Sequence, residues 1–502
     1  MYDEIFISDL KEVTEASEPI DYLVIGSGTA GVTAALALAE AGNHVVMLEA
    51  GPFILPGHVG STPFRSRGDI VPQIHERAVY HPSWITHEDH DALGDRVPEG
   101  NNNAWSLVGG RTVFWGGCTP RFQSWDFDDW PIDLADLEPW YLKAEQRMHV
   151  SGGPLQDHPA FFRSPGQDRL IDKLNQAGIA ARRAALGVDT QEVRNGHISR
   201  GFDSSVARLL RSGHLALHRS GPGITLVSEA EALRLQTKGR RVTGVEALDR
   251  RDGSRHTVPA NHVILAGGAV QSTRLALASG LDDPSGLIGH HVNDHLFVQG
   301  VIKLDKPVEE GPLYIFLEPT PEQPYHVQIQ GPFKETWYSP YHATVWLDPD
   351  PDGHYVLFYV FGIATMEKEN RVALRPAGDG PAMHDYVVVY DRSEQDLAVL
   401  EAMRAIMPRV AKTLGGSVVK DQINPPGASL HEVGGLRMSA DPASGVTDPV
   451  GRFWAYDNLA AADASIWPSQ GTANSYLTIT AMALRLGEAL AAGKTRPGDG
   501  VP

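Results

Sequence analysis

A histidine and an asparagine near the end of the chain have the side chains that are needed to activate a hydroxyl group. His431, in HEVGGLRMS, and Asn474, in GTANSYLT, lie 43 residues apart, each in a Gly-punctuated segment. A neutral imidazole accepts a proton near pH 7, and an amide holds an oxygen without titrating. Beside a bound hydride acceptor, the two residues would suffice to oxidise an alcohol. Taken alone, His431 could equally be a structural histidine.

The start of the chain has the elements that could position such an acceptor. A strand over Tyr22–Ile25 runs directly into the glycines of Gly26–Gly31, and an Ala/Leu-rich helix continues to about Ala41. A second strand over His44–Leu48 ends on Glu49. Together these segments form a βαβ unit with a GxGxxG fingerprint, which predicts a dinucleotide site.

Each position of the fingerprint has a physical role. Gly26 makes the tight turn, Gly28 lets backbone N–H groups approach a pyrophosphate, and Gly31 lets the helix close on the strand. The helix N-terminus stabilises the anion. Glu49 can accept hydrogen bonds from a ribose, and its charge disfavours a 2′-phosphate. The alternative is a Gly-rich turn that binds nothing.

A single fingerprint serves FAD and NAD alike. Two further Gly-rich segments, VGGRTVFWGG at 108–117 and ADASIWPSQGTAN at 462–474, would supply backbone donors along a long cofactor. The chain has no second GxGxxG for a separate NAD. These observations favour FAD.

The bulk composition excludes several classes of protein. The length of 502 residues allows about two to four domain-sized units. Lys and Arg total 43 against 62 Asp and Glu, and the net charge of −19 disfavours nucleic acids and anionic membrane surfaces. The single cysteine, Cys118, permits neither an intramolecular disulfide nor a thiolate zinc cluster. We recognise no signal peptide or membrane span, so a cytoplasmic enzyme is expected.

The middle of the chain alternates between strand-rich and helical stretches. We expect short strands over 224–265, antiparallel strands over 296–391 and an amphipathic helix over 394–414. The pattern indicates a nucleotide domain in separated pieces around an inserted antiparallel domain. The predicted segments are 1–75, 201–295 and 450–502 for the FAD domain, 76–200 for the cofactor cover and part of the substrate domain, and 296–449 for the substrate domain.

Several motifs resemble those of the glucose–methanol–choline (GMC) oxidoreductases. They are GSGTAG with Glu49, VGGRTVFWGG, AGGAVQSTRLALASG (266–280), HVNDHL (291–296), EKENRVAL (367–374), HEVGGLRMS and GTANSYLT. The resemblance covers nearly the whole chain. It implies an α/β flavoprotein of two domains, with a discontinuous Rossmann-like FAD domain and a substrate domain built on a large antiparallel sheet. YHVQIQ (325–330) and the His431–Asn474 spacing are most similar to the pyranose oxidase branch, whose short bacterial members include C-glycoside and glycoside 3-oxidases.

The resemblance implies a role for each matched position. His431 matches the catalytic base and Asn474 its partner on the same oxygen, while Gln328 and Ser429 match substrate-binding positions. The implied cofactor-binding residues are Gly26, Gly28, Thr29, Ala30, Gly31, Glu49, Ala50, Gly109, Gly110, Arg111, Thr112, Trp115, Gly116, Gly117, Cys118, Glu231, Asp463, Ala464, Ser475 and Tyr476.

Departures from the family pattern bear on cofactor linkage and specificity. Phe114 occupies the position at which fungal pyranose oxidases carry a flavinylated histidine, so FAD is expected to bind non-covalently. Leu436 replaces a second histidine of the C-terminal motif. Pro332 and Ile363 replace two polar sugar contacts, which favours oxidation at C3 of a glycoside over C2 of free glucose.

The resulting hypothesis is hydride transfer from a secondary hydroxyl of a pyranose or glycoside to FAD, which gives a ketosugar. Oxygen as acceptor would yield hydrogen peroxide, and a quinone is the alternative. Other hypotheses stay open: a related enzyme for a non-sugar alcohol such as choline, a redox-silent lyase on this fold, and a flavoprotein with only a binding role. A metal site at His290, His291 and His295 is not expected, because no carboxylate set completes it. The oligomeric state is left open.

Overall fold

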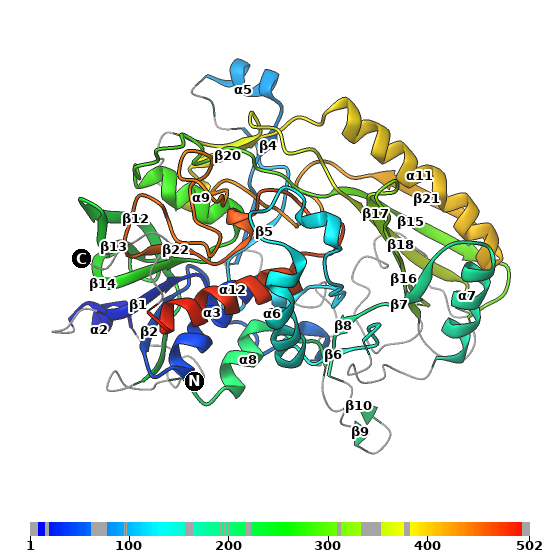
Figure 1. Cartoon of the computed structure of the whole chain (residues 1–502), viewed down its shortest axis with the longest axis horizontal. Coiled ribbons are helices and arrows are strands. Elements are labelled where there is room, and N and C mark those ends of the chain that lie inside the picture. The colour runs from blue at the N-terminus through cyan, green and yellow to red at the C-terminus, as the bar shows by residue number, and fades with distance from the viewer. Residues whose placement is uncertain are drawn as a thin grey trace.

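Two large β-sheets organise the molecule (Figure 1). The structure is a computed structural model that describes residues 9–15, 20–61, 78–94, 96, 98–155, 164–189, 193–194, 197–198, 201–215, 222–308, 313–332, 353–375 and 382–493. Residues 333–352, within the stretch expected to be rich in strands, lie outside the described residues. Across the described ranges, no helix combines the length and the apolar character that a membrane crossing needs.

The first sheet has a parallel core that is assembled from three separate parts of the sequence. Strands β11 (Gly223–Val227), β2 (His44–Leu48), β1 (Ile20–Ile25) and β14 (Arg255–Leu265) lie side by side in this order, and β22 (Leu459–Ala461) pairs with β14. The apolar runs of β2 and β11 are buried almost throughout, as expected for a parallel sheet. Strands β12 (Ala230–Lys238) and β13 (Arg241–Asp249) extend the sheet as antiparallel neighbours of β14.

Helix α3 (Thr29–Glu40) follows β1 and begins inside the glycine fingerprint. All of its residues except Glu40 are buried, so its small Ala and Gly side chains allow close packing on both the sheet and a neighbouring helix. That neighbour is α12 (Tyr476–Ala491), which follows Asn474 in the sequence. The N-terminal ends of α3 and α12 therefore lie side by side, although they come from the first and last parts of the sequence.

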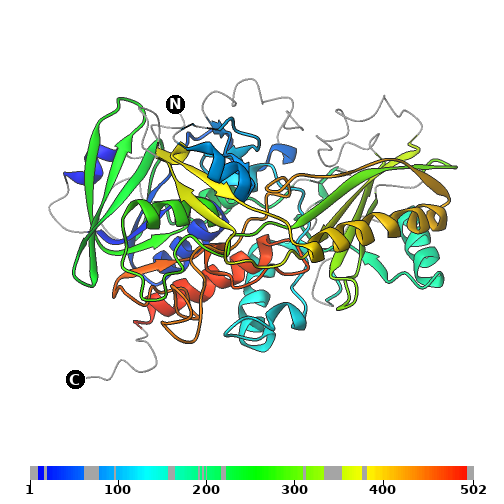
Figure 2. The same cartoon turned by 90° about the horizontal axis from the view of Figure 1, so that it is seen from above.

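The second sheet is antiparallel. Its six strands are β21 (Gly416–Ile423), β15 (Leu296–Leu304), β18 (Tyr355–Gly362), β17 (Tyr325–Gly331), β16 (Leu313–Leu317) and β7 (Ala181–Arg183), in this order. Alternate side chains such as those of Val298, Val327 and Phe358 share an apolar core with α11 (Glu394–Leu414), which runs along one face of the sheet (Figure 2). His326 and Gln328 lie at the alternating positions and therefore face the other way.

Smaller elements complete the fold. Strands β19 (Arg371–Leu374), β20 (Tyr386–Val389) and β4 (Trp84–Ile85) form a three-stranded sheet, and β3 (Val79–Tyr80) pairs with β5 (Ala104–Trp105). The other α-helices of the described part are α2 (Leu10–Thr14), α5 (His87–Leu93), α6 (Leu134–Arg147), α7 (Pro165–Gln176), α8 (Ser205–Arg211) and α9 (Ala269–Ala278), and its other strands are β6 (Val150–Ser151), β8 (Leu186–Gly187), β9 (Val193–Arg194) and β10 (His197–Ile198).

Candidate active site

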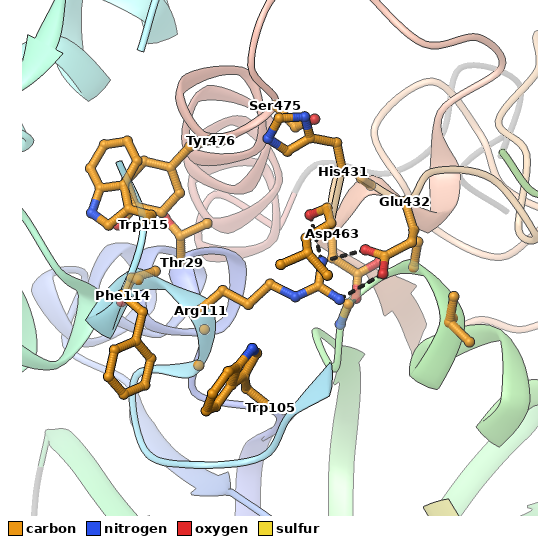
Figure 3. Close-up of a pocket in the computed structure, with 18 of the residues that line it drawn as sticks. Thr29, Trp105, Arg111, Phe114, Trp115, His431, Glu432, Asp463, Ser475 and Tyr476 are labelled. Atoms are coloured by element: carbon orange, nitrogen blue, oxygen red, sulfur yellow. Dashed lines mark hydrogen bonds and ion pairs between the residues drawn. The ribbon is translucent and has the colours of Figure 1, made fainter. Parts of the chain in front are cut away.

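A cavity of about 700 Å³ is lined by residues from both large sheets. The turn between β1 and α3 and the end of β2 form one part of its wall, and side chains of β15, β17 and β18 form another. Figure 3 shows Arg111 reaching across the cavity to Glu432, which accepts a hydrogen bond of 2.7 Å from it. The cavity thus joins the predicted dinucleotide site to the free face of the antiparallel sheet.

The turn between β1 and α3 has the geometry that a dinucleotide fingerprint requires. Gly26 has a φ of +108°, and a Cβ there would lie 2.4 Å from the carbonyl oxygen of Ala266. A Cβ on Gly31 would lie 1.9 Å from the oxygen of Gly26, so helix and strand are in backbone contact. At Gly28, no atom of the described residues lies within 4 Å of the Cβ position, and Gly28 lines the cavity. The turn therefore leaves room for a ligand at Gly28.

The carboxylate of Glu49 is buried at the end of β2, beside this turn. It accepts hydrogen bonds from the Ser27 amide and hydroxyl at 3.0 and 2.7 Å, and from the Gly51 amide at 3.0 Å. Burial raises the pKa of Glu49, and these hydrogen bonds oppose the rise. Because Glu49 also lines the cavity, it is placed to accept hydrogen bonds from a ribose.

Two helix N-termini reach the cavity without a side-chain cap. Gly28 precedes α3 and Ser475 precedes α12, and neither helix receives a capping hydrogen bond from that residue. The Ser475 hydroxyl is buried and finds no hydrogen-bond partner among the described residues. Unsatisfied N–H groups and an orphaned hydroxyl are the donors that an anionic or carbonyl-bearing ligand would satisfy. The cavity therefore fits a dinucleotide that extends from α3 to α12.

His431 and Asn474 meet at the wall of the same cavity. His431 Nε2 lies 3.4 Å from Asn474 Nδ2, and the His431 ring packs against Phe361 with centroids 4.9 Å apart. Burial lowers the pKa of His431 well below 6.5, and the neighbouring basic groups act in the same direction. The imidazole is consequently neutral at pH 7 and has one nitrogen that can accept a proton.

A series of hydrogen bonds through His295 determines which ring nitrogen of His431 can accept a proton. His295 Nε2 lies 2.7 Å from the Gly471 carbonyl oxygen, which only accepts, so Nε2 carries the proton. Burial lowers the pKa of His295 to about 4, so this ring is neutral and its Nδ1 is an acceptor. His431 Nδ1 lies 2.9 Å from that atom and donates to it, and Gln470 Nε2 donates to the same atom at 3.0 Å. His431 Nε2 therefore carries no proton, and its lone pair faces Asn474 Nδ2.

A second series of hydrogen bonds orients the amide of Asn474. His326 Nδ1 donates to the Thr472 carbonyl at 2.5 Å, which leaves His326 Nε2 to accept from Gln328 Nε2 at 2.9 Å. Gln328 Nε2 also donates to Asn474 Oδ1 at 2.7 Å. The NH₂ group of Asn474 is thereby directed toward His431. The two series of hydrogen bonds are consistent with each other. One leaves His431 Nε2 as an acceptor, and the other directs the Asn474 NH₂ group toward it as a donor.

Both series begin at consecutive backbone carbonyls, those of Gly471 and Thr472. Asp126 fixes this segment by accepting hydrogen bonds from the Thr472 amide at 2.9 Å and the Thr472 hydroxyl at 2.8 Å. Gly471 packs so tightly that a Cβ would lie 2.4 Å from the ring of Phe122. The segment that sets the proton positions of His431 and Asn474 is thus held in place by Asp126 and Phe122.

A buried carboxylate fixes the backbone of His431. Asp294 accepts from the His431 amide at 2.9 Å and from the Ser429 hydroxyl at 2.5 Å. Burial raises the pKa of Asp294 to about 7, and the nearby charge of Glu432 adds to the rise. Glu432 itself pairs with Arg111. Ser429, which was expected to bind substrate, lines the cavity, but its hydroxyl donates its hydrogen bond to Asp294.

The chain matches one protein family over most of its length. Residues 20–297 match the N-terminal part and residues 367–483 the C-terminal part of the family described as GMC oxidoreductase. The chain belongs to the GMC oxidoreductase family. The predicted family and α/β fold are therefore confirmed, and so is FAD, since GMC oxidoreductases are FAD enzymes.

Carbohydrate oxidases are among the relatives of this GMC oxidoreductase. It is 30% identical to the 6'''-hydroxyparomomycin C oxidase of Streptomyces lividus, over 94% of this chain and 91% of that protein. It is 25% identical to the C-glycoside 3-oxidase of Microbacterium trichothecenolyticum, over 93% and 95% of the two chains. A formate oxidase structure from Aspergillus oryzae has the same fold, with a TM-score of 0.71, 15% identity and coverage of 95% of this chain and 99% of the other.

Most of the predicted site residues of this GMC oxidoreductase line the cavity. His431, Asn474, Gln328 and Ser429 do so, and so do all the predicted cofactor-binding residues except three glycines. Those three pack behind the wall: a Cβ on Gly31, Gly109 or Gly117 would meet Gly26, Val113 or Phe202, respectively. Pro332 and Ile363, expected to shape the sugar site, are not among the described residues that line it.

Sequence reasoning missed several residues of the site. Gln330 could have been found, because the alternation in YHVQIQ places it on the same face as Gln328. His295 lies in the quoted HVNDHL motif, but its contact with His431 spans 136 residues of sequence. Among the other missed residues that line the cavity or support the His431–Asn474 pair are Asp126, Asp294, Phe297, Gln299, Tyr314, His326, Tyr359, Phe361, Asn424, Glu432 and Gln470.

Proposed function

We propose that this GMC oxidoreductase is a sugar oxidase that converts a secondary hydroxyl of a pyranose or glycoside to a ketone. One observation carries the proposal: the lone pair of His431 Nε2 and the NH₂ group of Asn474 converge 3.4 Å apart beside the Gln328 amide. A hydroxyl placed there meets an acceptor for its proton and a donor for its oxygen.

Each residue then has a defined part in the reaction. FAD, when bound, supplies the acceptor for the carbinol hydride. His431 takes the hydroxyl proton at Nε2, and Asn474 donates a hydrogen bond to the oxygen as it becomes a carbonyl. The imidazolium that forms on His431 keeps its Nδ1 proton and donates it in a hydrogen bond to the neutral ring of His295, 2.9 Å away. Arg111 and Glu432 compensate each other's charge beside the reacting pair.

The carbon that is oxidised is proposed to be C3, with C2 as the alternative. Two relatives are C-glycoside 3-oxidases, from Arthrobacter globiformis at 27% identity and from Microbacterium trichothecenolyticum at 25% identity. Oxygen is the proposed electron acceptor, which would yield hydrogen peroxide, and a quinone is the alternative. The names of these relatives as oxidases support oxygen.

FAD is proposed to bind without a covalent bond. Phe114, at the position of the fungal flavinylated histidine, lines the cavity and offers no nucleophile. His58 also lines the cavity, but Nε2 bonds to the Trp115 carbonyl at 2.8 Å and Nδ1 accepts from the Gly60 amide at 2.9 Å. Burial raises the pKa of the Cys118 thiol to about 12, which leaves it unreactive at neutral pH.

A second candidate is a dehydrogenase for a non-sugar alcohol. Its support is a relative of 25% identity, the 2-methyl-1,2-propanediol dehydrogenase of Mycolicibacterium austroafricanum, which covers 95% of this chain and 96% of its own. The reacting pair would serve either substrate. Polar side chains on the wall beyond the pair, such as Gln299 and Asn424, favour a substrate with several hydroxyls.

Anaerobic mixing separates these proposals. The holoenzyme is mixed with glucose, methyl β-glucoside or 2-methyl-1,2-propanediol, and bleaching of the flavin absorbance is followed. We expect the sugars to bleach the flavin, the isolated product to be a 3-ketosugar by NMR, and peroxide to form when air is admitted. Bleaching by the diol alone would replace the sugar proposal with the second candidate, and no bleaching by any alcohol would favour a lyase.

A further inference from the structure

The cavity continues along the antiparallel sheet beyond the reacting pair. Gln328 on β17, Tyr359 on β18 and Gln299 on β15 are direct neighbours across the strands, and all three line the cavity. On β21 the residue opposite Gln299 is Gln422, and Asn424, two residues further on and level with Phe297, accepts a hydrogen bond from Gln299 Nε2 at 2.9 Å through its side-chain oxygen. From β17 to β21 the sheet crosses three strand intervals, which is about 14 Å. That length exceeds a single six-membered ring.

An aromatic row runs beside these amides. Phe361 packs against the reacting His431 with ring centroids 4.9 Å apart. Phe297 then stacks on Phe361, with centroids 4.7 Å apart and an interplanar angle of 7°. Both phenylalanines line the cavity. The wall therefore offers an apolar surface and a hydrogen-bonding edge in parallel, away from His431.

The far end of this wall lies toward solvent, and the charge beside it, that of Arg392 on the Asn424 carbonyl at 2.6 Å, is not among the described groups that line the cavity. Asn424, Pro425 and Ala428 line it, and Pro425 is exposed. Among the described residues that line this end, none has an ionisable acid or base. An occupant that is cationic or anionic would lose its hydration there without gaining a partner. The wall suits an uncharged ring.

We propose that Phe297, Gln299, Tyr359 and Asn424 form a second subsite that binds the ring attached to the oxidised sugar. The ligand class is an uncharged ring with an apolar face and a hydrogen-bonding edge, either a phenolic aglycone or a second pyranose. This inference rests on the proposed function, because it takes the first sugar to lie at His431 and Asn474. It also replaces Pro332 and Ile363 as the origin of specificity.

A substrate series tests the subsite in the holoenzyme. The rate of anaerobic flavin reduction is measured for glucose, methyl β-glucoside, phenyl β-glucoside and cellobiose. The ring-bearing substrates should exceed glucose and methyl glucoside in kcat/KM by about ten- to hundredfold, the gain from burying one further ring. A preference for phenyl glucoside identifies an aglycone subsite, and a preference for cellobiose identifies a sugar subsite. Equal values for all four would overturn the inference.

Two variants test whether the preference for ring-bearing substrates arises at this subsite. Gln299→Ala should lower the ratio of the preferred glucoside to glucose by about three- to tenfold, through loss of one hydrogen bond. Ala428→Phe fills the far end and should bring the ratio close to one. Gln422→Ala is the matched control: Gln422 also donates to the Asn424 oxygen, at 2.7 Å, but it is not among the described residues that line the cavity.

The outcomes distinguish a failure of the subsite proposal from a failure of the proposed sugar oxidation. A preference that Gln299→Ala and Ala428→Phe leave intact, or that Gln422→Ala lowers as much as Gln299→Ala, overturns the subsite while sugar oxidation stands. If no sugar bleaches the wild-type flavin, the proposed function itself has failed. The FAD content of each variant shows that it has folded, so a loss of ratio is not mistaken for a loss of protein.

Discussion

The Nδ1 atoms of His295 and His431 lie 2.9 Å apart, and His295 is the residue that accepts. This direction follows from the Gly471 carbonyl, which takes the only proton of the neutral His295 ring. His431 is therefore kept in the tautomer whose Nε2 is free. Neighbouring histidines could share a proton in several ways, and here one backbone oxygen selects the arrangement in which His431 Nε2 can accept a proton.

Replacement of His295 should therefore slow catalysis without weakening substrate binding. In His295→Ala, the His431 proton has no acceptor at Nδ1 and is free to move to Nε2, where it blocks the substrate hydroxyl. Loss of a hydrogen bond to the charged imidazolium predicts a kcat lower by about 10- to 100-fold. KM should change little. His295→Asn offers an amide oxygen in the same direction and should recover part of the loss. Equal activity of His295→Ala and wild type would contradict the tautomer assignment.

Removal of the proposed base, His431, should have a larger effect on the rate. His431→Ala is expected to lower the rate of anaerobic flavin reduction by about 100- to 10,000-fold, with FAD still bound. Retention of FAD is expected because Asp294 holds residue 431 through its backbone amide at 2.9 Å, a bond that alanine keeps. Stopped-flow absorbance measures the rate, and the visible spectrum reports the bound flavin. Reduction at the wild-type rate would remove His431 from the mechanism.

The pH profile should report the depressed pKa of His431. Only the neutral ring accepts a proton, so activity is full above the pKa and falls as the pH drops through it. Because burial keeps this pKa below 6.5, kcat/KM should stay flat from pH 7 to below 6.5 before its acid limb begins. Asn474→Asp places a carboxylate beside the ring, which stabilises imidazolium and should move the limb to higher pH. A wild-type limb centred at or above 6.5 would show that a group other than the His431 ring, such as Asp294 with its pKa raised to about 7, controls the profile.

Asp126 should influence catalysis although it does not line the cavity. It fixes the Thr472 amide and hydroxyl, and thereby the two carbonyls that orient the reacting pair. Asp126→Ala is expected to cost about 2–4 kcal/mol of stability and also to reduce kcat at temperatures where the variant is fully folded. Asp128→Ala, which removes an exposed carboxylate from the same segment, is the control. A lower melting temperature with an unchanged kcat would assign Asp126 a purely structural role.

Local patterns predicted the parts of the fold that depend on neighbouring residues. The fingerprint from Gly26 to Gly31, the apolar strand before it and the Ala-rich helix after it are contiguous, so spacing alone reveals them. The same holds for the alternation around Gln328. Strand β21, by contrast, is a half-exposed strand at the sheet edge with a mixed polar sequence. Its sequence has no hydrophobic pattern from which a strand could be predicted.

The support of the reacting pair could not be predicted because it depends on long-range contacts. The bond between Asp126 and Thr472 spans 346 residues, and that between His326 and Thr472 spans 146. Strand register, which brings Gln299 beside Tyr359, is likewise absent from any short segment. For this reason the sequence placed specificity at Pro332 and Ile363, whereas the described cavity wall beyond Gln328 consists of other residues.

Two glycines of the fingerprint allow the binding of FAD to be tested separately from folding. A Cβ at Gly28 would meet no described atom within 4 Å, whereas a Cβ at Gly31 would lie 1.9 Å from the Gly26 oxygen. Gly28→Val should therefore fold as an apoprotein and lose FAD, because its side chain fills the space through which backbone N–H groups reach the pyrophosphate. Gly31→Val should instead lose folded protein, since the helix cannot close on the strand. Circular dichroism and the flavin released by acid precipitation measure the two properties. Full FAD content in Gly28→Val would mean that the pyrophosphate lies elsewhere, and wild-type flavin left on the acid pellet would show a covalent bond.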